Sequence, residues 1–369
     1  MSQLLNVLII GWGSSAKTFH VPLIISLPND FKITHVLERR TNNSLQVLPD
    51  VTIVRSLEEF FDSGAQVDLA VITTPNHTHF ELAKTLLEHK INTVIEKPFV
   101  TDSQQVQELL SIARKNNVLI TAYQNRRWDG DFLTAKKLIE NKTLGRIVEF
   151  ESHFDRYRNF LKHNWKEEDI PGSGIVYDLA SHLIDQALWL FGEPTTVYAR
   201  IMNQRKLQGT ATPDAFEIHL NYDHEATEEG EYPSMIVILK GGMLIKEEKR
   251  LRFKIHGVDG SYLKYGLDVQ EDQLKVGLTP LKDDTVFGKE KEEWQWGELS
   301  ISGQDGTTQT QKYQTLPGTY IEFYKNIAEV LHTKDLSRLI VTPEQAGNVI
   351  KVIKLAYQSN KTKAAVSFH

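Results

Sequence analysis

The sequence predicts an α/β protein in two parts: a doubly wound parallel sheet, then an α+β domain with an open, mostly antiparallel sheet. Three observations predict this fold class. Strand-like and helix-like segments alternate over the first third of the chain, and a glycine-rich turn follows the first strand. Later strand-like segments succeed one another with turns between them. We place the first domain at residues 1–124 and the second at 125–369.

The first domain contains six expected strands with helices between them. Repeated strand–helix units imply a parallel sheet with right-handed crossovers. Pro75 cannot continue the fourth strand, and Asn76 is suited to cap the helix that follows. The expected strands are Leu4–Ile10, Ile33–Leu37, Val51–Val54, Leu69–Ile72, Ile91–Ile95 and Val118–Ala122, and the expected helices are Lys17–Leu27, His77–Glu88 and Ser103–Lys115.

The second domain mixes helices with strands that are separated by turns. Two charged segments, 225–231 and 282–293, have little periodicity and are interpreted as solvated loops or insertions. The expected helices are Phe132–Glu140, Ile175–Phe191, Tyr320–His332 and Pro343–Ser359, and the expected strands are Ile147–Phe154, Thr196–Met202, Phe216–Tyr222, Ser234–Leu239 and Arg252–His256.

The composition excludes several classes of function. A chain of 369 residues is too long for one ordinary core, and its net charge of −6 gives no electrostatic reason to bind nucleic acid or an anionic membrane. With no cysteine, thiolate zinc sites and thiol nucleophiles are excluded. No apolar run approaches the roughly 20 residues of a membrane-spanning helix. Leu4–Ile10 is too short for a secretory segment, so we expect a cytoplasmic protein.

The glycine-rich turn predicts a dinucleotide site. Gly11 allows a tight turn, Gly13 lets the backbone approach a pyrophosphate, and Ala16 permits close packing of helix on strand. The helix that begins here adds free N–H groups and the positive end of its dipole. The whole turn is Gly11, Trp12, Gly13, Ser14, Ser15 and Ala16.

The choice of dinucleotide depends on the end of the second strand. Glu38 would accept hydrogen bonds from a ribose 2′-OH, which favours NAD. Arg39 and Arg40 would instead pair with a 2′-phosphate, which favours NADP. Two solvated arginines beside a glutamate are a third interpretation. We favour NADP, with NAD as the alternative.

Lys97 lies in Glu96-Lys97-Pro98, directly after the strand Ile91–Ile95. The carboxyl end of a parallel strand faces the crevice in which open α/β sheets bind their ligands. A lysine there can hold a reacting oxygen and stabilise developing alkoxide charge. A surface lysine before a turn proline is the alternative.

Asp178 and His182 form the second candidate group. They are four residues apart in an expected helix, which places them on one face. Leu179 and Leu183 begin an apolar stripe beside them. A carboxylate raises the pKa of a histidine and orients it, which suits proton transfer to and from a carbinol oxygen. An ordinary i,i+4 pair that supports the helix is the alternative.

Other polar residues carry weaker signals. Arg156 and Tyr157 favour polyol recognition or strand-edge packing, and Arg126 favours a phosphate or substrate contact or exposed hinge packing. His77 and His79 are two apart at the start of a helix, so their imidazoles lie on different faces and no carboxylate cluster completes a metal site. We expect no metal.

Taken in order, these motifs resemble the Gfo/Idh/MocA family of oxidoreductases. The resemblance rests on Gly11-x-Gly13-x-x-Ala16, Thr74-Pro75-Asn76-x-x-His79, Glu96-Lys97-Pro98 and Asp178-x-x-x-His182. It covers essentially the whole chain. Segments at 125–129, 151–158 and 262–270 are similar to the subgroup that contains NADP-dependent scyllo-inositol dehydrogenase.

The resemblance implies a Rossmann domain and a second domain whose open sheet commonly forms a homodimer or higher homo-oligomer. It implies Lys97, Asp178 and His182 as the catalytic set, with His182 as the base. From the motifs and the resemblance together, we expect cofactor contacts from the turn 11–16 with Arg39, Arg40, Thr74, Pro75, Asn76, His79, Glu96 and Lys97. We expect substrate contacts from Lys97, Arg126, Arg156, Tyr157, Asp178 and His182.

The expected function is hydride transfer between NADP and a secondary alcohol of a cyclitol or sugar. An aldose 1-dehydrogenase or a carbonyl reductase of the same family is one alternative. A dinucleotide-binding regulator without catalytic activity is an alternative of another class, but the intact Lys97 and His182 argue against it.

Overall fold

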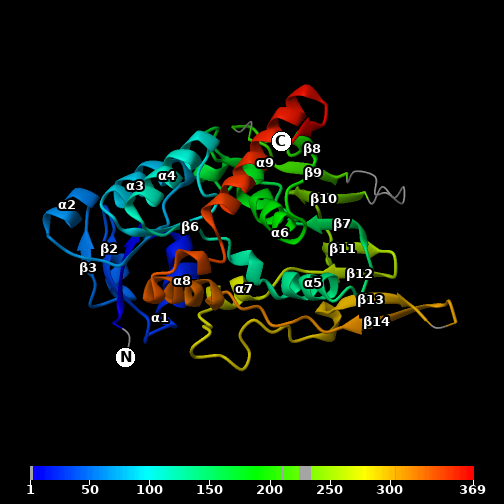
Figure 1. Ribbon diagram of the computed structural model, residues 1–369, viewed down its shortest axis with the longest axis horizontal. Helices are drawn as coiled ribbons and strands as arrows, with labels where there is room; N and C mark the ends of the chain where they lie inside the picture. Colours follow the sequence, from blue (N-terminus) through cyan, green and yellow to red (C-terminus); the bar gives the residue numbers. More distant parts are fainter. Residues whose placement is uncertain (1–2, 210–211, 224–233, 304) are drawn as a thin grey trace. The chain divides into compact units, whose positions relative to one another are not determined.

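The computed structural model describes residues 3–209, 212–223, 234–303 and 305–369. The chain divides into two compact units, each built from three segments. The first unit consists of Met1–Trp128, Gln270–Phe287 and Thr319–Gly347, and the second of Asp129–Val269, Gly288–Gly318 and Asn348–His369. Figure 1 shows the elements of both. A single boundary after residue 124 was expected, whereas two later segments of the chain return to the first unit.

The first unit contains a six-stranded parallel sheet of order β3-β2-β1-β4-β5-β6. This order reverses next to β1, so the carboxyl ends of β1 and β4 border the crevice in which such sheets bind dinucleotides. The doubly wound parallel sheet is therefore confirmed. Its strands are β1 (Leu5–Ile10), β2 (Phe31–Leu37), β3 (Thr52–Val54), β4 (Leu69–Ile72), β5 (Asn92–Ile95) and β6 (Ile120–Ala122).

Helices cover both faces of this sheet, with α3 and α4 together on one face and α1 and α8 on the other (Figure 1). Side-chain caps begin two of them, Ser56 at α2 and Asp102 at α4, and each leaves one fewer unsatisfied N–H group. The helices of the unit are α1 (Val21–Ile25), α2 (Leu57–Asp62), α3 (His79–Glu88), α4 (Ser103–Asn116), α7 (Gln270–Lys275) and α8 (Ile321–Thr333).

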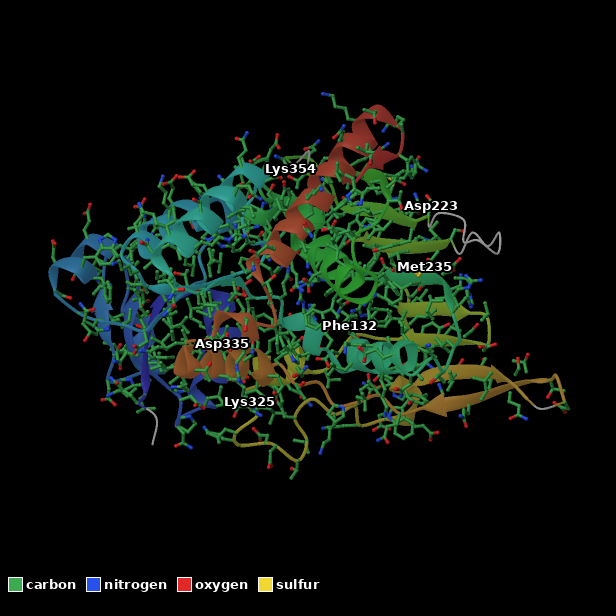
Figure 2. The ribbon with its side chains drawn as sticks, in the orientation of Figure 1. Phe132, Asp223, Met235, Lys325, Asp335 and Lys354 are labelled. Carbon is green, nitrogen blue, oxygen red and sulfur yellow. The ribbon has the colours of Figure 1, made fainter. Side chains whose placement is uncertain are left out.

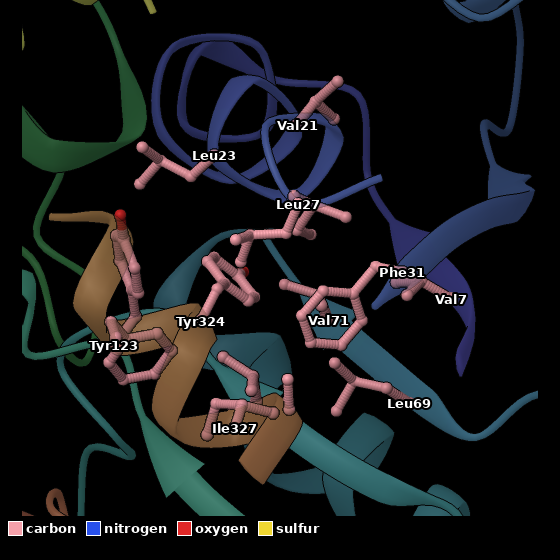
Figure 3. Packing of buried hydrophobic residues seen from close by; sticks show 14 of the residues in the cluster. Val7, Val21, Leu23, Leu27, Phe31, Leu69, Val71, Tyr123, Tyr324 and Ile327 are labelled. Carbon is pink, nitrogen blue, oxygen red and sulfur yellow. The ribbon is translucent and has the colours of Figure 1, made fainter. Parts of the chain in front are cut away.

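Helix α8 completes the core of the first unit although it lies some 200 residues beyond the sheet in sequence. Figure 3 shows Tyr324 and Ile327 of α8 among other buried side chains, including Val71 of β4 and Tyr123, which directly follows β6. The Tyr324 ring meets the Phe31 ring edge-on at 6.0 Å between centroids. The sequence predicted this helix but placed it in the second domain.

The second unit contains a nine-stranded sheet of order β14-β13-β12-β11-β7-β10-β9-β8-β15. Among the described residues of this sheet, β7 and β10 pair in parallel and the other neighbouring strands pair antiparallel, so the mostly antiparallel sheet is confirmed. Its strands are β7 (Ile147–His153), β8 (Thr196–Met202), β9 (Ala215–Tyr222), β10 (Met235–Gly242), β11 (Leu251–Gly257), β12 (Gly260–Tyr265), β13 (Gly297–Ser302), β14 (Thr308–Tyr313) and β15 (Val366–Ser367).

Three helices accompany this sheet: α5 (Gly130–Glu140), α6 (Ser181–Phe191) and α9 (Pro343–Thr362), of which α9 begins in a segment of the first unit. A buried ion pair ties α5 to the sheet, because Nε of Arg252 on β11 lies 3.1 Å from Oδ2 of Asp131. Phe132, labelled in Figure 2, is fully buried on the same helix.

The two charged segments that were predicted to be solvated loops, 225–231 and 282–293, compare differently with the structure. Residues 225–231 lie outside the described part of the chain, between Asp223 and Met235 (Figure 2). Residues 282–293 form an irregular and mostly exposed stretch, as expected. Within it, however, Phe287 is buried and Glu290 pairs at 2.8 Å with the fully buried Lys264, so this part is not a purely solvated loop.

Candidate active site

The glycine-rich turn leaves β1 in the conformation that a dinucleotide site requires. Gly11 has φ +98°, and a Cβ atom there would meet Cγ2 of Thr74 at 3.0 Å. A Cβ atom at Gly13 would meet only the carbonyl oxygen of Thr73, at 4.0 Å, which leaves open space beside the backbone. Ala16 is fully buried against the sheet. The turn therefore fits the pyrophosphate of a dinucleotide.

The helix after this turn begins irregularly. Ala16–His20 form a π-helical turn, and α1 follows it directly with Pro22 in its first turn. A regular helix over 17–27 was expected, and the structure replaces it with a π turn and a shorter α-helix. The π turn places His20 inside the unit, where its side chain is fully buried.

Glu96 links the glycine-rich turn to the end of β5. Its Oε1 accepts hydrogen bonds from Oγ of Ser15 and, at 3.2 Å, from Nε2 of His20. Its Oε2 accepts the backbone N–H of Lys97 at 2.7 Å. Nδ1 of His20 in turn lies 2.6 Å from the hydroxyl of Tyr324 on α8. The Lys97-Pro98 peptide bond is cis.

Electrostatics keep Glu96 ionised. Burial raises the pKa of its carboxyl, but the hydrogen bond and charge of His20, the charge of Lys97 and the hydrogen bond from Ser15 outweigh burial and lower the pKa to about 2. A carboxylate that accepts donors on both oxygens is held firmly in place. Glu96 therefore fixes the backbone from which the Lys97 side chain extends.

The turn after β4 lies beside the glycine-rich turn. Oγ1 of Thr73 donates to the carbonyl oxygens of Ile10 and Gly11, both at 3.0 Å. The segment Thr74-Pro75-Asn76 then enters a 3₁₀ turn at Asn76–Thr78, so Asn76 lies inside this turn. The residue that precedes α3 is Thr78, and its side chain caps no N–H group. Asn76 therefore does not occupy the N-cap position of α3.

His79 supports the loops around the nucleotide turn and is fully buried. Its Nδ1 lies 3.0 Å from the carbonyl oxygen of Pro98, and its Nε2 lies 3.0 Å from that of Thr74. Burial lowers the pKa of this imidazole more than the neighbouring carbonyls raise it. With its two nitrogens beside the carbonyl oxygens of Pro98 and Thr74, His79 lies between two loops, which favours a supporting role over direct contact with the cofactor.

At the end of β2 the glutamate and the arginines behave differently. The Glu38 side chain is buried and accepts hydrogen bonds from the hydroxyls of Thr41 and Ser44 and from the N–H groups of Asn43 and Ser44. Burial raises its pKa, but these hydrogen bonds outweigh burial and lower it. Arg39 and Arg40 are both exposed. The acceptor sites of Glu38 are thus used by its own loop.

In the second unit, His182 lies in the first turn of α6 and Asp178 in the π-helical turn Val176–Ala180 before it. The i,i+4 spacing expected for this pair assumes a regular helix, which the π turn interrupts. Oδ1 of Asp178 lies 2.6 Å from Nζ of Lys166. The imidazole of His182 stacks on the Phe154 ring at 6.3 Å between centroids.

Arg156 and Tyr157 lie on opposite sides of an extended segment after β7. Tyr157 forms an isolated antiparallel bridge with Leu244, and successive side chains alternate in such a segment. The Arg156 guanidinium lies 5.2 Å from the centre of the Phe154 ring, so it is on the side of His182. The Tyr157 ring is 41% exposed and carries Lys246 over it.

Known sequence families match nearly the whole chain. Residues 5–124 match the model described as "Oxidoreductase family, NAD-binding Rossmann fold". Residues 136–368 match "Oxidoreductase family, C-terminal alpha/beta domain". The chain belongs to the Gfo/Idh/MocA family. The resemblance seen in the sequence is confirmed.

Full-length relatives agree with this assignment. The scyllo-inositol 2-dehydrogenase (NADP(+)) IolW of Bacillus subtilis is 34% identical over 362 residues, with 98% of this chain and 95% of the relative covered. An uncharacterized oxidoreductase of Schizosaccharomyces pombe is 36% identical over 368 residues, with 97% of each protein covered. The solved structure of the oxidoreductase yvaA from Bacillus subtilis matches with a TM-score of 0.89 at 33% identity, covering 100% of this chain and 99% of that one. The chain is an oxidoreductase with a nicotinamide-nucleotide-binding Rossmann domain.

Arg126 is not exposed, in contrast to the exposed hinge packing that was one interpretation of its sequence position. It is buried, its NH2 group lies 2.5 Å from Oε2 of Glu271, and its NH1 group donates to the hydroxyl of Tyr320 at 3.2 Å. Burial raises the pKa of Glu271, but the charges of Arg126 and Lys275 outweigh it and lower the pKa to about 2. This buried pair joins segments of the first unit, which favours a structural role for Arg126.

Two further features concern metals and membranes. Among the described residues, no group of three or more histidine, aspartate or glutamate side chains is arranged to hold a metal ion. Across the same residues, no helix is both long and apolar enough to cross a membrane.

Two residues that support the strand end carrying Lys97, His20 and Tyr324, were not predicted from the sequence. No role was assigned to His20 from the sequence, and Tyr324 was included only in the expected helix Tyr320–His332. Glu96, the partner of His20, is 76 residues from it in sequence, Tyr324 is bound to the other nitrogen of His20, and no periodicity connects such positions. A histidine and a tyrosine in otherwise apolar helices were the only available signal.

Proposed function

We propose that this protein is an NADP-dependent dehydrogenase or reductase that acts on a secondary alcohol of a cyclitol or sugar. The observation that carries the proposal is the double attachment of Glu96. One oxygen binds Ser15 of the nucleotide turn, and the other binds the backbone of Lys97. A cation at the end of β5 is thereby fixed to the turn suited to the dinucleotide, which is the arrangement that hydride transfer at a carbinol requires.

The bound nicotinamide supplies the hydride acceptor or donor. The residues of the chain handle the substrate oxygen and its proton. Lys97 holds the carbinol oxygen and stabilises negative charge as the proton leaves. His182 accepts that proton during oxidation and returns it during reduction. Phe154 stacks on the imidazole of His182 and restrains the plane of that ring. Asp178, which pairs with Lys166, supplies negative charge in the turn before His182 and balances the positive charge of the protonated imidazole.

NADP is favoured over NAD by the end of β2. The Glu38 carboxylate already accepts four hydrogen bonds from its own loop, so it is poorly placed to accept a ribose hydroxyl as well. Arg55 also binds this loop, donating to the carbonyl oxygens of Glu38 and Thr41. Exposed Arg39 and Arg40 at the start of an anchored loop suit a 2′-phosphate. The relative named as NADP(+)-linked supports the same choice.

The test is a panel of cyclitols, aldoses and their keto forms, assayed with NADP and NAD separately at the nicotinamide absorbance. We expect turnover of at least one member, with NADP preferred. Lys97→Ala and His182→Ala should each lower kcat at least 100-fold, since removal of a group that acts on the transferred proton or charge typically costs about 10²–10⁴. NADPH affinity, measured by fluorescence, should change little in His182→Ala.

Arg39→Ser with Arg40→Ser should reverse the cofactor preference by weakening NADP alone. Near-normal turnover in both Lys97→Ala and His182→Ala would reject the catalytic assignment. NADPH binding without turnover across the whole panel would favour the non-catalytic regulator. Turnover restricted to aldose C1 would favour the aldose 1-dehydrogenase.

A further inference from the structure

Five cationic side chains gather beside the candidate catalytic helix of the second unit. Four lie within 13 consecutive positions after β7, and the fifth follows β8. They are Arg156, Arg158, Lys162, Lys166 and Arg205. This density of positive charge is unexpected in a chain of net charge −6.

Carboxylates neutralise two of the five. Lys166 pairs with Asp178 at 2.6 Å. Arg205 pairs with Asp214 at 2.9 Å and with Glu167 at 3.4 Å, and it also donates to the carbonyl oxygen of Phe160. These two cations therefore have structural partners.

The other three cations, Arg156, Arg158 and Lys162, form no ion pair with a carboxylate among the described residues. Within the described segments of the chain, no carboxylate lies within 4.0 Å of their charged groups. Arg156 contacts the face of the Phe154 ring, and this aromatic contact leaves its N–H groups available for hydrogen bonds.

The backbone conformation places the side chains of Arg156 and Arg158 on the same side of the extended segment after β7. The N–H groups of Arg156 and Arg158 donate to the carbonyl oxygens of Gly242 and Met243, at 2.9 and 2.7 Å, which keeps this segment extended. Residues two apart in an extended segment share a side, so Phe154, Arg156 and Arg158 project together. Phe154 stacks on His182, and this places the arginine side chains on the same side of the strand as the candidate base.

The unpaired cations repel one another. Burial lowers the pKa of Arg158, and the charges of Arg156 and Arg205 lower it further, which together outweigh the opposite effect of the Glu167 and Asp178 carboxylates. The charge of Arg158 is the largest cause of a lowered pKa at Lys162, followed by burial and by the charges of Arg156 and Lys166. An anion bound among them would relieve this repulsion.

We propose that the substrate carries an anionic group, a carboxylate or a phosphate, which Arg158 and Lys162 bind together with Arg156. The inference rests on the proposed function and narrows it from neutral polyols to acidic sugars or cyclitols. A guanidinium matches the two oxygens of either anion in a bidentate manner, and Lys162 adds a point charge. A neutral polyol would leave these three cations without an ion-pair partner among the described residues, and the charges of Glu167 and Asp178 only partly offset their repulsion.

The test compares matched substrates that differ only in charge. One arm pairs aldoses with their uronates, and the other pairs inositols with their monophosphates, so the arms distinguish carboxylate from phosphate. We expect kcat/KM to be at least 10-fold higher for the charged member of one arm. Arg158→Gln and Lys162→Gln should each lower that value 10- to 100-fold, mainly through KM, and leave neutral substrates within about 2-fold.

Lys246→Gln is the matched control, because Lys246 is exposed and lies over the Tyr157 ring at 5.3 Å, away from the arginine side of the strand. Its kcat/KM for charged substrates should stay within about 2-fold. High salt should weaken turnover of the charged substrate more in the wild type than in Arg158→Gln, since screening acts on the charge that the variant lacks.

The possible failures are separable. Equal turnover of charged and neutral members, with no effect of Arg158→Gln or Lys162→Gln, would overturn the anionic substrate and leave the proposed function standing. If nothing is turned over, calorimetric titration with glucuronate and with inorganic phosphate still decides, because binding that Arg158→Gln does not weaken overturns the inference. A loss of NADPH affinity above 10-fold in Arg158→Gln would assign the cations to the cofactor and also overturn it.

Discussion

The buried Glu96 carboxylate predicts a pH-dependent contribution to the stability of the first unit. In the folded chain its pKa is about 2, against an ordinary value of 4.5. One pKa unit corresponds to about 1.4 kcal/mol, so Glu96→Gln is expected to lower the free energy of unfolding by about 3 kcal/mol at pH 7. Glutamine keeps the shape of the side chain and removes the charge that His20 and Lys97 stabilise.

The direction of the pH dependence follows from the lowered pKa. The stabilisation is fully present above the unfolded value of 4.5 and is lost as the pH falls through about 2. The difference between wild type and Glu96→Gln should therefore be constant from pH 8 to about pH 5 and fall to about 2 kcal/mol at pH 3.5.

Urea unfolding at pH 7, 5 and 3.5, followed by circular dichroism and tryptophan fluorescence, measures this difference. Glu81→Gln is the control, since Glu81 is exposed on α3 and forms no salt bridge with any described residue. It should change the free energy of unfolding by less than about 0.5 kcal/mol. A Glu96→Gln effect below 1 kcal/mol at pH 7, or one that grows as the pH falls, would refute the assigned network.

Two further predictions concern the cofactor turn and the core. Gly13→Val should weaken NADPH binding at least 10-fold by fluorescence titration while changing the melting temperature by less than about 3 °C, because the Cβ position is open and would fill the approach of the pyrophosphate. Phe323→Ala should cost about 3–5 kcal/mol of unfolding free energy in urea, because its buried ring contacts those of Tyr123, Trp128 and Tyr324. A loss below 1 kcal/mol would show that α8 is not part of this core.

Local patterns of sequence were enough to predict most of the sheet in the first unit. Buried parallel strands such as Leu69–Ile72 are short apolar runs between turn residues, and all six were found. The late strands of the second unit carry a different signal. Thr308–Tyr313 is polar and largely exposed at the sheet edge, so it has no apolar alternation to reveal it. Its partner, β13, holds it by backbone hydrogen bonds, which do not depend on side-chain pattern.

Some residues of the candidate site could also be predicted from local sequence, whereas the roles of others could not. Position relative to a strand end was sufficient to single out Lys97 and the glycine-rich turn. The roles of Glu38, His79 and Arg126 were not readable, because each depends on partners brought close only by folding. For Glu38 the partners are loop N–H groups, for His79 two carbonyl oxygens, and for Arg126 the distant Glu271. In each case the charge and residue type indicated a contact with cofactor or substrate. The burial of these side chains and their hydrogen bonds within the protein instead favour a role in supporting the structure around the site.

Two π-helical turns explain why helical periodicity predicted the functional helices but not their contacts. One, Ala16–His20, begins the helix after the nucleotide turn, and the other, Val176–Ala180, begins the helix of His182. A π turn closes its hydrogen bonds one residue later than an α turn, which rotates the following side chains away from regular spacing. In the first unit this brings His20 inward to Glu96 and Tyr324, and thereby stiffens the strand end that carries Lys97. In the second it precedes His182 and contains Asp178, which meets Lys166. The positions of His182, the candidate proton-handling group, and of Lys97, the candidate group that stabilises charge, thus depend on irregular backbone. Substitutions that restore a regular helix at either π turn should therefore disturb the site without disturbing the sheets.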